Sequence, residues 1–241
     1  MKNYLKAKSV TSFAVAIFVL AGASSTSAAV VFQSDFSGVS VTSGVDNINN
    51  TVSGITWDTT NGIDTPDTSM VFVGNGANDI DFFNRSDEIA VDYNFQDDGS
   101  WYTEVTSINL DASTSSISLT NLLVDLTVIN NSGSEVTNDN TVVATVEVFG
   151  SSSGSIGSNF LSQTDTGSGY ITYDIDLSSL SALGSSETYT VRLLLEREGL
   201  GNASIDNLIL NGNLTAVPEP SSFAFLAACL GSLTLLRRRR A

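Results

Sequence analysis

Apolar and polar residues alternate along much of the chain with a period of two. In Thr141–Phe149, valine or alanine stands at every second position, and Thr145 and Glu147 lie between them. This alternation, rich in β-branched residues, is typical of a strand with one buried and one exposed face. Three further long segments show it: Leu122–Asn130, Tyr170–Leu177 and Thr188–Glu196. Six shorter candidates precede them: Val30–Phe36, Gly54–Trp57, Met70–Val73, Ile80–Phe83, Glu88–Tyr93 and Tyr102–Leu110.

Turn-forming residues separate these segments. Gly, Asn, Asp and Ser concentrate in stretches such as Asp46–Asn50, Thr59–Asp67 and Gly150–Asn159. Outside the two chain ends, no run of 12 or more residues has a convincing helical period. Short strands with frequent turns predict an all-β fold, and we expect residues 30–215 to form one antiparallel β-sandwich of jelly-roll type.

Two short segments at the ends of this domain carry a resemblance. Residues 30–36 read Val-Val-Phe-Gln-Ser-Asp-Phe, and residues 203–210 read Ala-Ser-Ile-Asp-Asn-Leu-Ile-Leu. They resemble the first and last strands of carbohydrate-binding-type sandwiches. The resemblance implies that the two strands lie close together, and that an aspartate near the last strand can help to hold a structural calcium beside the first.

Asp206 is the candidate calcium ligand on the last strand, and Asp35 on the first strand is its natural partner. In a regular strand Asp206 shares a face with Leu208 and Leu210, which we expect in the core. A buried carboxylate is costly unless it is paired or bound to a metal. The alternative is that Asp206 lies at a strand end, where it caps a turn or pairs with an arginine.

Three aromatic residues are candidates for sugar binding. Trp57, Trp101 and Tyr102 could form a stacking platform for sugar rings, because aromatic faces bury apolar sugar surface well. Trp101 follows a turn-rich stretch, which favours an exposed position. The alternative is that both tryptophans belong to the core. An exposed aromatic strip beside polar side chains would favour sugar binding, whereas uniformly polar faces would favour a structural role.

The N-terminal residues have the pattern of an export signal. Lys2, Lys6 and Lys8 precede the uncharged, mostly apolar run Val10–Ala23, and small residues fill Ser24–Ala29. This order predicts a signal peptide over residues 1–29 with an apolar helix that is too short for a good membrane span. We expect signal peptidase to cut after Ala28 or Ala29.

The C-terminal residues have three parts. Pro218, Glu219 and Pro220 form a stiff, extended segment, because proline fixes its own φ and biases the residue before it away from helix. The run Ser221–Leu236 has no charge, and its 16 residues would give about 24 Å of helix, short of a comfortable span. Four adjacent cations then form a membrane stop on the cytoplasmic side: Arg237, Arg238, Arg239 and Arg240.

This order of parts resembles the PEP-CTERM sorting signal, with residues 216–241 as the signal. In that family a membrane transpeptidase called exosortase recognises the tail and cleaves near Pro-Glu-Pro. The body then passes to the cell surface or an extracellular polymer matrix in Gram-negative bacteria. The resemblance implies that Pro218, Glu219 and Pro220 are recognition residues of a substrate, and that the hydrophobic helix holds an inner-membrane intermediate. The alternative is a plain membrane anchor that follows a chance Pro-Glu-Pro.

The charge between the two ends excludes several functions. This part of the chain has 25 acidic residues against Arg85, Arg192 and Arg197, a formal charge of −22 that repels nucleic acid. It has no histidine or lysine, and the single cysteine, Cys229, lies in the tail. A Ser-His-Asp triad, a Cys-His dyad, a lysine Schiff base and a His- or Cys-ligated zinc site are therefore excluded.

Carboxylate chemistry and binding of a hard cation such as calcium remain. We expect an exported, non-enzymatic surface or matrix protein whose partners are signal peptidase and exosortase. The alternative is a carbohydrate-binding module that acts in the exopolysaccharide layer. A glycoside hydrolase or lyase that uses a carboxylate pair is the weakest interpretation, because no Asp/Glu pair stands out in the sequence.

Overall fold

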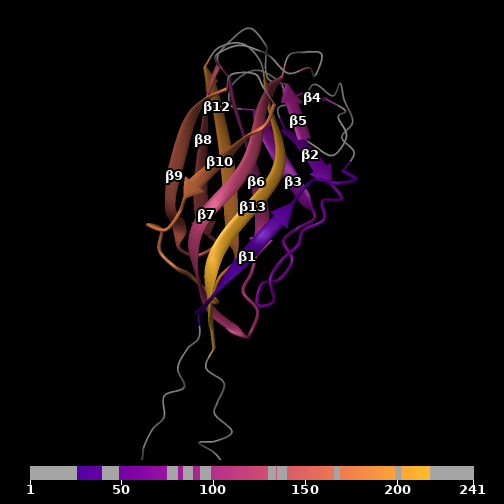
Figure 1. Ribbon diagram of the computed structural model, residues 1–241. Helices are drawn as coiled ribbons and strands as arrows, with labels where there is room; N and C mark the ends of the chain where they lie inside the picture. The colour runs from indigo at the N-terminus through magenta and orange to yellow at the C-terminus, as the bar shows by residue number, and fades with distance from the viewer. Residues whose placement is uncertain are drawn as a thin grey trace, which may run out of the picture. The chain divides into compact units, whose positions relative to one another are not determined.

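The computed structural model describes most of the chain between its two ends. The described ranges are 26–39, 49–74, 81–83, 89–92, 99–129, 134, 140–165, 169–198 and 202–217. All of them belong to one compact unit, Ser24–Val217. They form two antiparallel sheets, and no helix occurs within these ranges (Figure 1).

Seven strands form the first sheet: β1 (Thr26–Ser34), β4 (Asp81–Phe83), β5 (Ile89–Asp92), β7 (Thr114–Ile129), β10 (Ile171–Asp176), β11 (Leu183–Gly184) and β13 (Asn202–Ala216). β13 lies at the centre of this sheet. It pairs along its whole length with β7, and on its other side with β1 and β5. β10 and β11 pair with the far side of β7, and β4 extends the sheet beyond β5.

Six strands form the second sheet: β2 (Asn49–Ser53), β3 (Ser69–Gly74), β6 (Gly99–Ile108), β8 (Asn140–Gly150), β9 (Gly154–Asp165) and β12 (Tyr189–Glu198). Their order is β2-β3-β6-β12-β8-β9. β12 is therefore central, with β6 on one side and β8 on the other. β9 pairs only with β8 among the described strands, so it forms one edge of this sheet.

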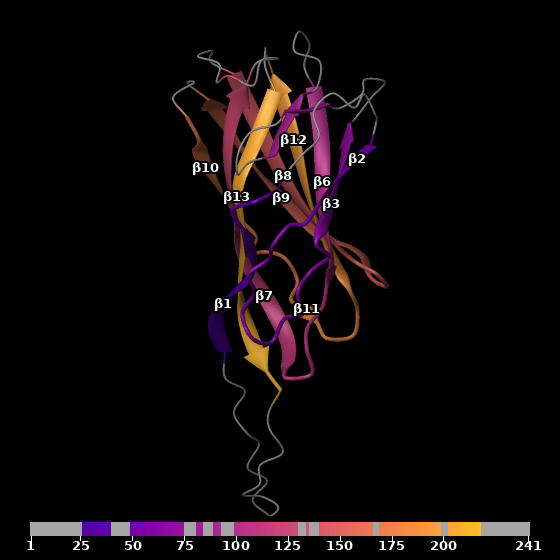
Figure 2. The same ribbon diagram turned by 90° about the vertical axis from the view of Figure 1, so that its right-hand side faces the viewer.

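The core lies between the two sheets, which pack face to face (Figure 2). On β8, Val142, Ala144, Val146 and Val148 are at most 1% exposed, while the residues between them are half-buried. The period-two pattern of the sequence thus sorts one face of each strand into the core. Phe32 and Trp57 meet edge to face in it, with ring centroids 5.2 Å apart.

The structure confirms the all-β fold of two antiparallel sheets. It also confirms that the first and last strands are neighbours, since β1 pairs with β13 from Thr26–Thr215 to Ser34–Leu208. The two helices expected at the chain ends fall outside the described residues. Within the described part of the chain, no helix is long and apolar enough to cross a membrane.

Candidate functional site

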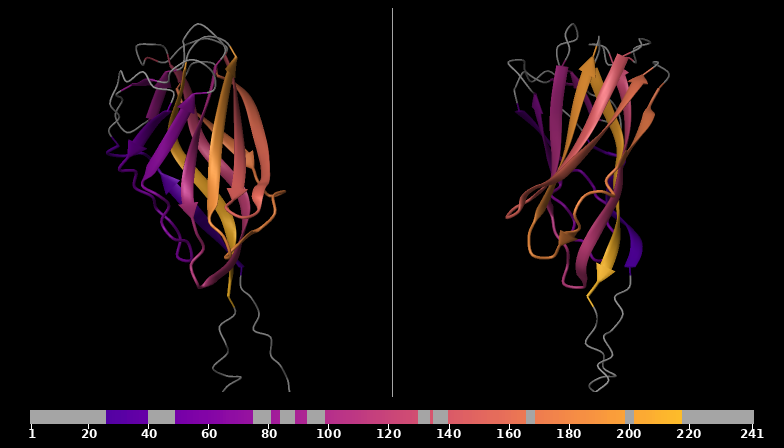
Figure 3. Two further views of the ribbon diagram at one scale, coloured as in Figure 1. Left: turned by 180° about the vertical axis from the view of Figure 1, so that it is seen from behind. Right: turned by 90° about the vertical axis from the view of Figure 1, so that its left-hand side faces the viewer.

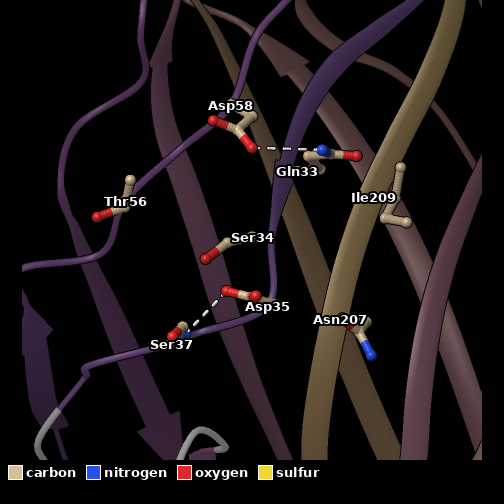
Figure 4. Close-up of a pocket in the computed structure, with 8 residues that line it drawn as sticks. All are labelled: Gln33, Ser34, Asp35, Ser37, Thr56, Asp58, Asn207 and Ile209. Atoms are coloured by element: carbon tan, nitrogen blue, oxygen red, sulfur yellow. Dashed lines mark hydrogen bonds between the residues drawn. The ribbon is translucent and has the colours of Figure 1, made fainter.

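A polar hollow of about 490 Å³ opens along β1, beside β13 and the segment that contains Thr56 and Asp58 (Figure 4). Carboxylate, hydroxyl and amide groups line most of it, so it offers hydrogen bonds or oxygen ligands. Its lining residues are Gln33, Ser34, Asp35, Ser37, Thr56, Asp58, Asn207 and Ile209.

Local backbone pairing positions the two carboxylates of the hollow. Gln33 and Asp58 exchange both backbone hydrogen bonds, at 2.9 and 3.0 Å, so Asp58 continues the sheet at the edge of β1. Gln33 Nε2 also donates to Asp58 Oδ2 at 3.4 Å. Asp35 lies just past β1, and its Oδ1 accepts a hydrogen bond from the Ser37 N–H at 3.0 Å. This contact is an Asx turn, in which the carboxylate caps the chain reversal after the strand.

Asp206 does not share a face with Leu208 and Leu210, contrary to the prediction. A β-bulge separates Asp206, which pairs with Asp125, from Leu208, and Asn207 adopts a φ of 44°. The extra residue shifts the alternation by one, so that Ile205 and Leu208 both enter the core while Asp206 stays half-buried. Asp206 Oδ1 accepts the Asn207 N–H at 2.8 Å. Asp206 therefore caps the bulge, a role similar to the predicted alternative in which it caps a turn.

The predicted calcium site at Asp35 and Asp206 was based on a carboxylate buried in the core, and this register leaves Asp206 half-buried instead. Asp35 lines the hollow, but Asp206 does not, and Asn207 takes its place there. Within the described ranges, no three acidic, histidine or cysteine side chains group as metal ligands. Calcium stays a prediction, and it would need oxygens that the sequence did not identify.

The predicted aromatic platform does not form. Trp57 is 6% exposed and Trp101 is 3% exposed, so the alternative that places both in the core is confirmed. Trp57 Nε1 donates to the Asp67 carbonyl at 2.8 Å, and Trp101 packs on Phe72 with ring centroids 5.5 Å apart. Of the three candidates, only Tyr102 is partly exposed.

Tyr102 belongs to a cluster that sequence reasoning missed, on the outer face of the six-stranded sheet. Register on β12 places Arg192 directly between Glu104 of β6 and Glu147 of β8. Arg192 Nε and Nη2 donate to Glu104 Oε1 at 2.9 and 2.7 Å, and Nη1 donates to Glu147 Oε2 at 3.2 Å. The guanidinium carbon lies 4.4 Å from the Tyr102 ring centroid and 4.9 Å from that of Phe149. We call these five residues the Arg192 cluster.

Glu104 and Glu147 stabilise the charged form of Arg192. Burial opposes that charge, but the hydrogen bond and charge of Glu104 and the charge of Glu147 outweigh it, so the pKa of Arg192 rises above its usual value. The flanking rings add cation–π contacts. The guanidinium is therefore held in place between two carboxylates and two aromatic side chains, and a third of the side chain of Glu147 remains exposed.

Exposed apolar side chains extend the surface around this cluster. Phe160 on the edge strand β9 is 63% exposed, and it pairs with Thr145 of β8. Val71 on β3 is 39% exposed and pairs with Glu104. Figure 3 shows, in its left panel, the six-stranded sheet that carries these residues in front. This face thus combines an exposed aromatic residue with polar side chains.

Four carboxylates in the described part of the chain have a lowered pKa because they accept hydrogen bonds from nearby residues. The Ser107 hydroxyl, and then that of Thr106, lower the pKa of Asp67 by donating to its Oδ2 at 2.7 and 2.9 Å. Hydrogen bonds from nearby serines likewise lower the pKa values of Asp111, Asp176 and Glu187. These groups are ionised caps at neutral pH, unlike a general acid, whose pKa must be raised.

Comparison with solved structures finds carbohydrate-binding modules. The family 11 carbohydrate-binding module of the cellulosomal cellulase Lic26A-Cel5E of Clostridium thermocellum is 16% identical over 78% of this chain and 95% of that chain, with a TM-score of 0.35. A family 11 module from the same organism, in complex with a β-1,3-1,4-mixed-linked tetrasaccharide, is 15% identical over 75% and 95%, with a TM-score of 0.33. Chains that superpose so loosely do not align residue by residue, and no binding residue is transferred from them.

Sequence comparison gives a sharper result at the C-terminal side of β13. No curated protein matches the chain significantly. The family model of the PEP-CTERM protein-sorting motif matches residues 216–240. The match contains Pro218, Glu219 and Pro220, the uncharged run and the four arginines. The chain therefore carries a PEP-CTERM protein-sorting motif, which indicates a surface protein sorted by exosortase.

Proposed function

We propose that the β-sandwich is the non-enzymatic cargo of this sorting pathway. An N-terminal signal peptide exports the chain, an exosortase-type transpeptidase of a Gram-negative bacterium removes the tail, and the sandwich reaches the cell surface or an extracellular polymer matrix. One observation carries the proposal: the sorting motif starts at residue 216, where the last strand of the sandwich ends. The folded unit and the sorting motif therefore meet at Ala216.

The chemistry of the body supports a role without catalysis. Between the two ends the sequence lacks histidine, lysine and cysteine, so a cysteine or lysine nucleophile and a histidine base are missing. The four carboxylates with displaced pKa values in the described ranges are all lowered, as expected for structural caps. These features suit a domain whose fold and surface, rather than a reaction, are delivered.

Glu219→Gln should abolish removal of the tail, because it removes the only charge of the Pro-Glu-Pro segment. The variant should stay in the membrane fraction with Arg237–Arg240 attached, whereas wild type should be released without them. Glu196→Gln is the matched control, since Glu196 is an exposed glutamate on β12. Immunoblots of membrane and released fractions, with one antibody against the sandwich and one against the tail, measure this. Release of Glu219→Gln at the wild-type level would contradict the proposal.

We propose as a second candidate that the outer face of the six-stranded sheet binds a neutral polysaccharide. The supporting observation is that the Arg192 cluster shares this face with the exposed Phe160, which pairs with Thr145, two residues from Glu147. Sugar rings can stack on exposed aromatic faces, while fixed carboxylates and a guanidinium bind hydroxyl groups. A body with a formal charge of −22 would repel acidic polymers, so the favoured ligand is uncharged.

Phe160→Ser should weaken polysaccharide binding about tenfold, the loss expected when one aromatic contact to a ligand is removed. Asp58→Asn, in the polar hollow, is the control and should bind as wild type does. A glycan array of the released protein identifies the ligand, and thermal unfolding of the same protein in EDTA and in millimolar calcium tests the calcium prediction. Equal binding by wild type and Phe160→Ser, or loss of binding in Asp58→Asn, would refute this face as the site.

A further inference from the structure

The sandwich and its sorting motif overlap. β13 ends at Ala216, the residue at which the motif begins. Ala216 pairs with Thr114 of β7, and the Val217 N–H still donates to the Ser113 carbonyl at 2.8 Å. Pro218 therefore follows directly on a backbone that is hydrogen-bonded to the sheet. There is no spacer between the fold and the recognition segment.

Side chains strengthen this end of the strand. Leu214 is 6% exposed and belongs to the core. Thr215 pairs with Ser116 of β7, and its carbonyl accepts a hydrogen bond from the Ser115 hydroxyl at 2.8 Å. The last three residues of β13 are thus fixed by the ladder, by burial and by a hydroxyl group.

The β7 side of this end does not depend on the signal peptide. Thr26 of β1 also pairs with Thr215, but a cut after Ala28 or Ala29 would remove the first residues of β1. The pairs with β7 would remain, since β7 lies within the body. Processing at the N-terminus would therefore free one side of the end of β13 and leave the other side closed.

A closed strand limits where a processing enzyme can cut. Enzymes that cleave peptides bind them in extended form through backbone groups, and the end of β13 still uses those that face β7 within the sheet. Cleavage of a folded chain then requires local opening, and its rate follows the population of the open form. Peptide bonds up to Ala216–Val217 lie in backbone that is hydrogen-bonded to the sheet, so their cleavage requires this opening. The bonds after Val217 come after the last hydrogen bond that the structure describes.

We propose that Val217 is the N-terminal limit of processing: the sorting enzyme cuts a bond after Val217, and the end of β13 must open before the enzyme can bind the residues on the body side. This inference rests on the proposed function. In the reaction, a peptide C–N bond breaks, the acyl carbon passes to an enzyme nucleophile, and the leaving nitrogen takes the nucleophile's proton. Water or an acceptor amine then takes the acyl group and returns a proton to the enzyme. The released body keeps all of β13.

Ser115→Ala tests the opening step because it removes the hydroxyl group that holds the Thr215 carbonyl. We expect the full-length variant to lose its tail about fivefold faster than wild type, as the loss of one hydrogen bond shifts the opening equilibrium. Ser118→Ala is the matched control: it is an exposed serine of the same strand, paired with Asn213. Pulse-chase labelling in the producing cells gives the rates, and peptide mapping of the released protein gives its C-terminal residue.

The results separate this inference from the function on which it rests. Faster processing of Ser115→Ala alone, with a product that contains Val217, supports the inference. A product that ends before Val217, or equal rates for the two serine variants, overturns it while tail removal itself stands. A wild-type chain that keeps its tail in cells that process other PEP-CTERM chains overturns both the inference and the proposed function.

Discussion

Phe32→Ala should destabilise the sandwich by about 3–5 kcal/mol, the cost of deleting a large buried ring and leaving its cavity. Phe32 is fully buried on β1 and meets Trp57 edge to face. It therefore joins the first strand to the segment that follows β2. A loss of this size is a large share of the total stability of an ordinary domain, about 5–15 kcal/mol. Urea denaturation of the released, purified protein measures the free energy of unfolding.

Phe160→Ala is the control for this prediction. Both variants lose the same atoms, but Phe160 is 63% exposed on an edge strand. The free energy of unfolding should therefore change by less than about 0.5 kcal/mol. If the two substitutions destabilise equally, the placement of β1 against the core is wrong.

Gly212→Ala should destabilise the fold by about 1–3 kcal/mol, as expected for overpacking in a strand that cannot move. Gly212 lies in the central strand β13 at a shift of register with β7. A Cβ at this position would lie 2.7 Å from Ile117 Cγ2, 3.1 Å from the Ser118 carbonyl oxygen and 3.3 Å from Val31 Cγ2. Alanine normally suits a strand interior better than glycine, so the steric contact decides the sign.

Gly184→Ala provides the comparison. Its nearest neighbours would be the Tyr189 hydroxyl at 3.9 Å and the Ser186 hydroxyl at 4.0 Å, which are ordinary contacts. We expect an unfolding midpoint within about a degree or two of wild type, because surface changes usually cost less than 0.5 kcal/mol. A stable Gly212→Ala would show that β13 is less tightly enclosed by β1 and β7 than the structure describes.

Features of the fold that depend on neighbouring residues in the sequence could be predicted from the sequence. Alternation on β8 identified its buried face correctly, because a half-buried strand must alternate. It missed the start of β9, because Gly150–Asn159 was interpreted as turn-rich. Glycine, serine and asparagine have low strand propensity, yet pairing with β8 forms the strand. Propensity is a weak guide wherever neighbouring strands supply the hydrogen bonds.

The candidate sites show the same contrast between residues that are contiguous in the sequence and residues that only the fold brings together. The Pro-Glu-Pro tail could be interpreted from sequence, since its parts are contiguous. Asp206 was misplaced by one bulged residue, although Ile205 and Leu208, both apolar but three apart, were a signal of the bulge. The Arg192 cluster joins three strands that are distant in sequence, and only their register places Glu104 and Glu147 on either side of the arginine.

Intact mass spectrometry of the wild-type protein released from its producing cells tests the central claim most directly. If the PEP-CTERM motif directs processing of a folded cargo, the released chain should lack Arg237–Arg240 and the uncharged run before them, and should retain the whole of β13. A released or surface-exposed protein that still carries Arg237–Arg240 would contradict sorting at the motif, and would identify the tail as a plain membrane anchor.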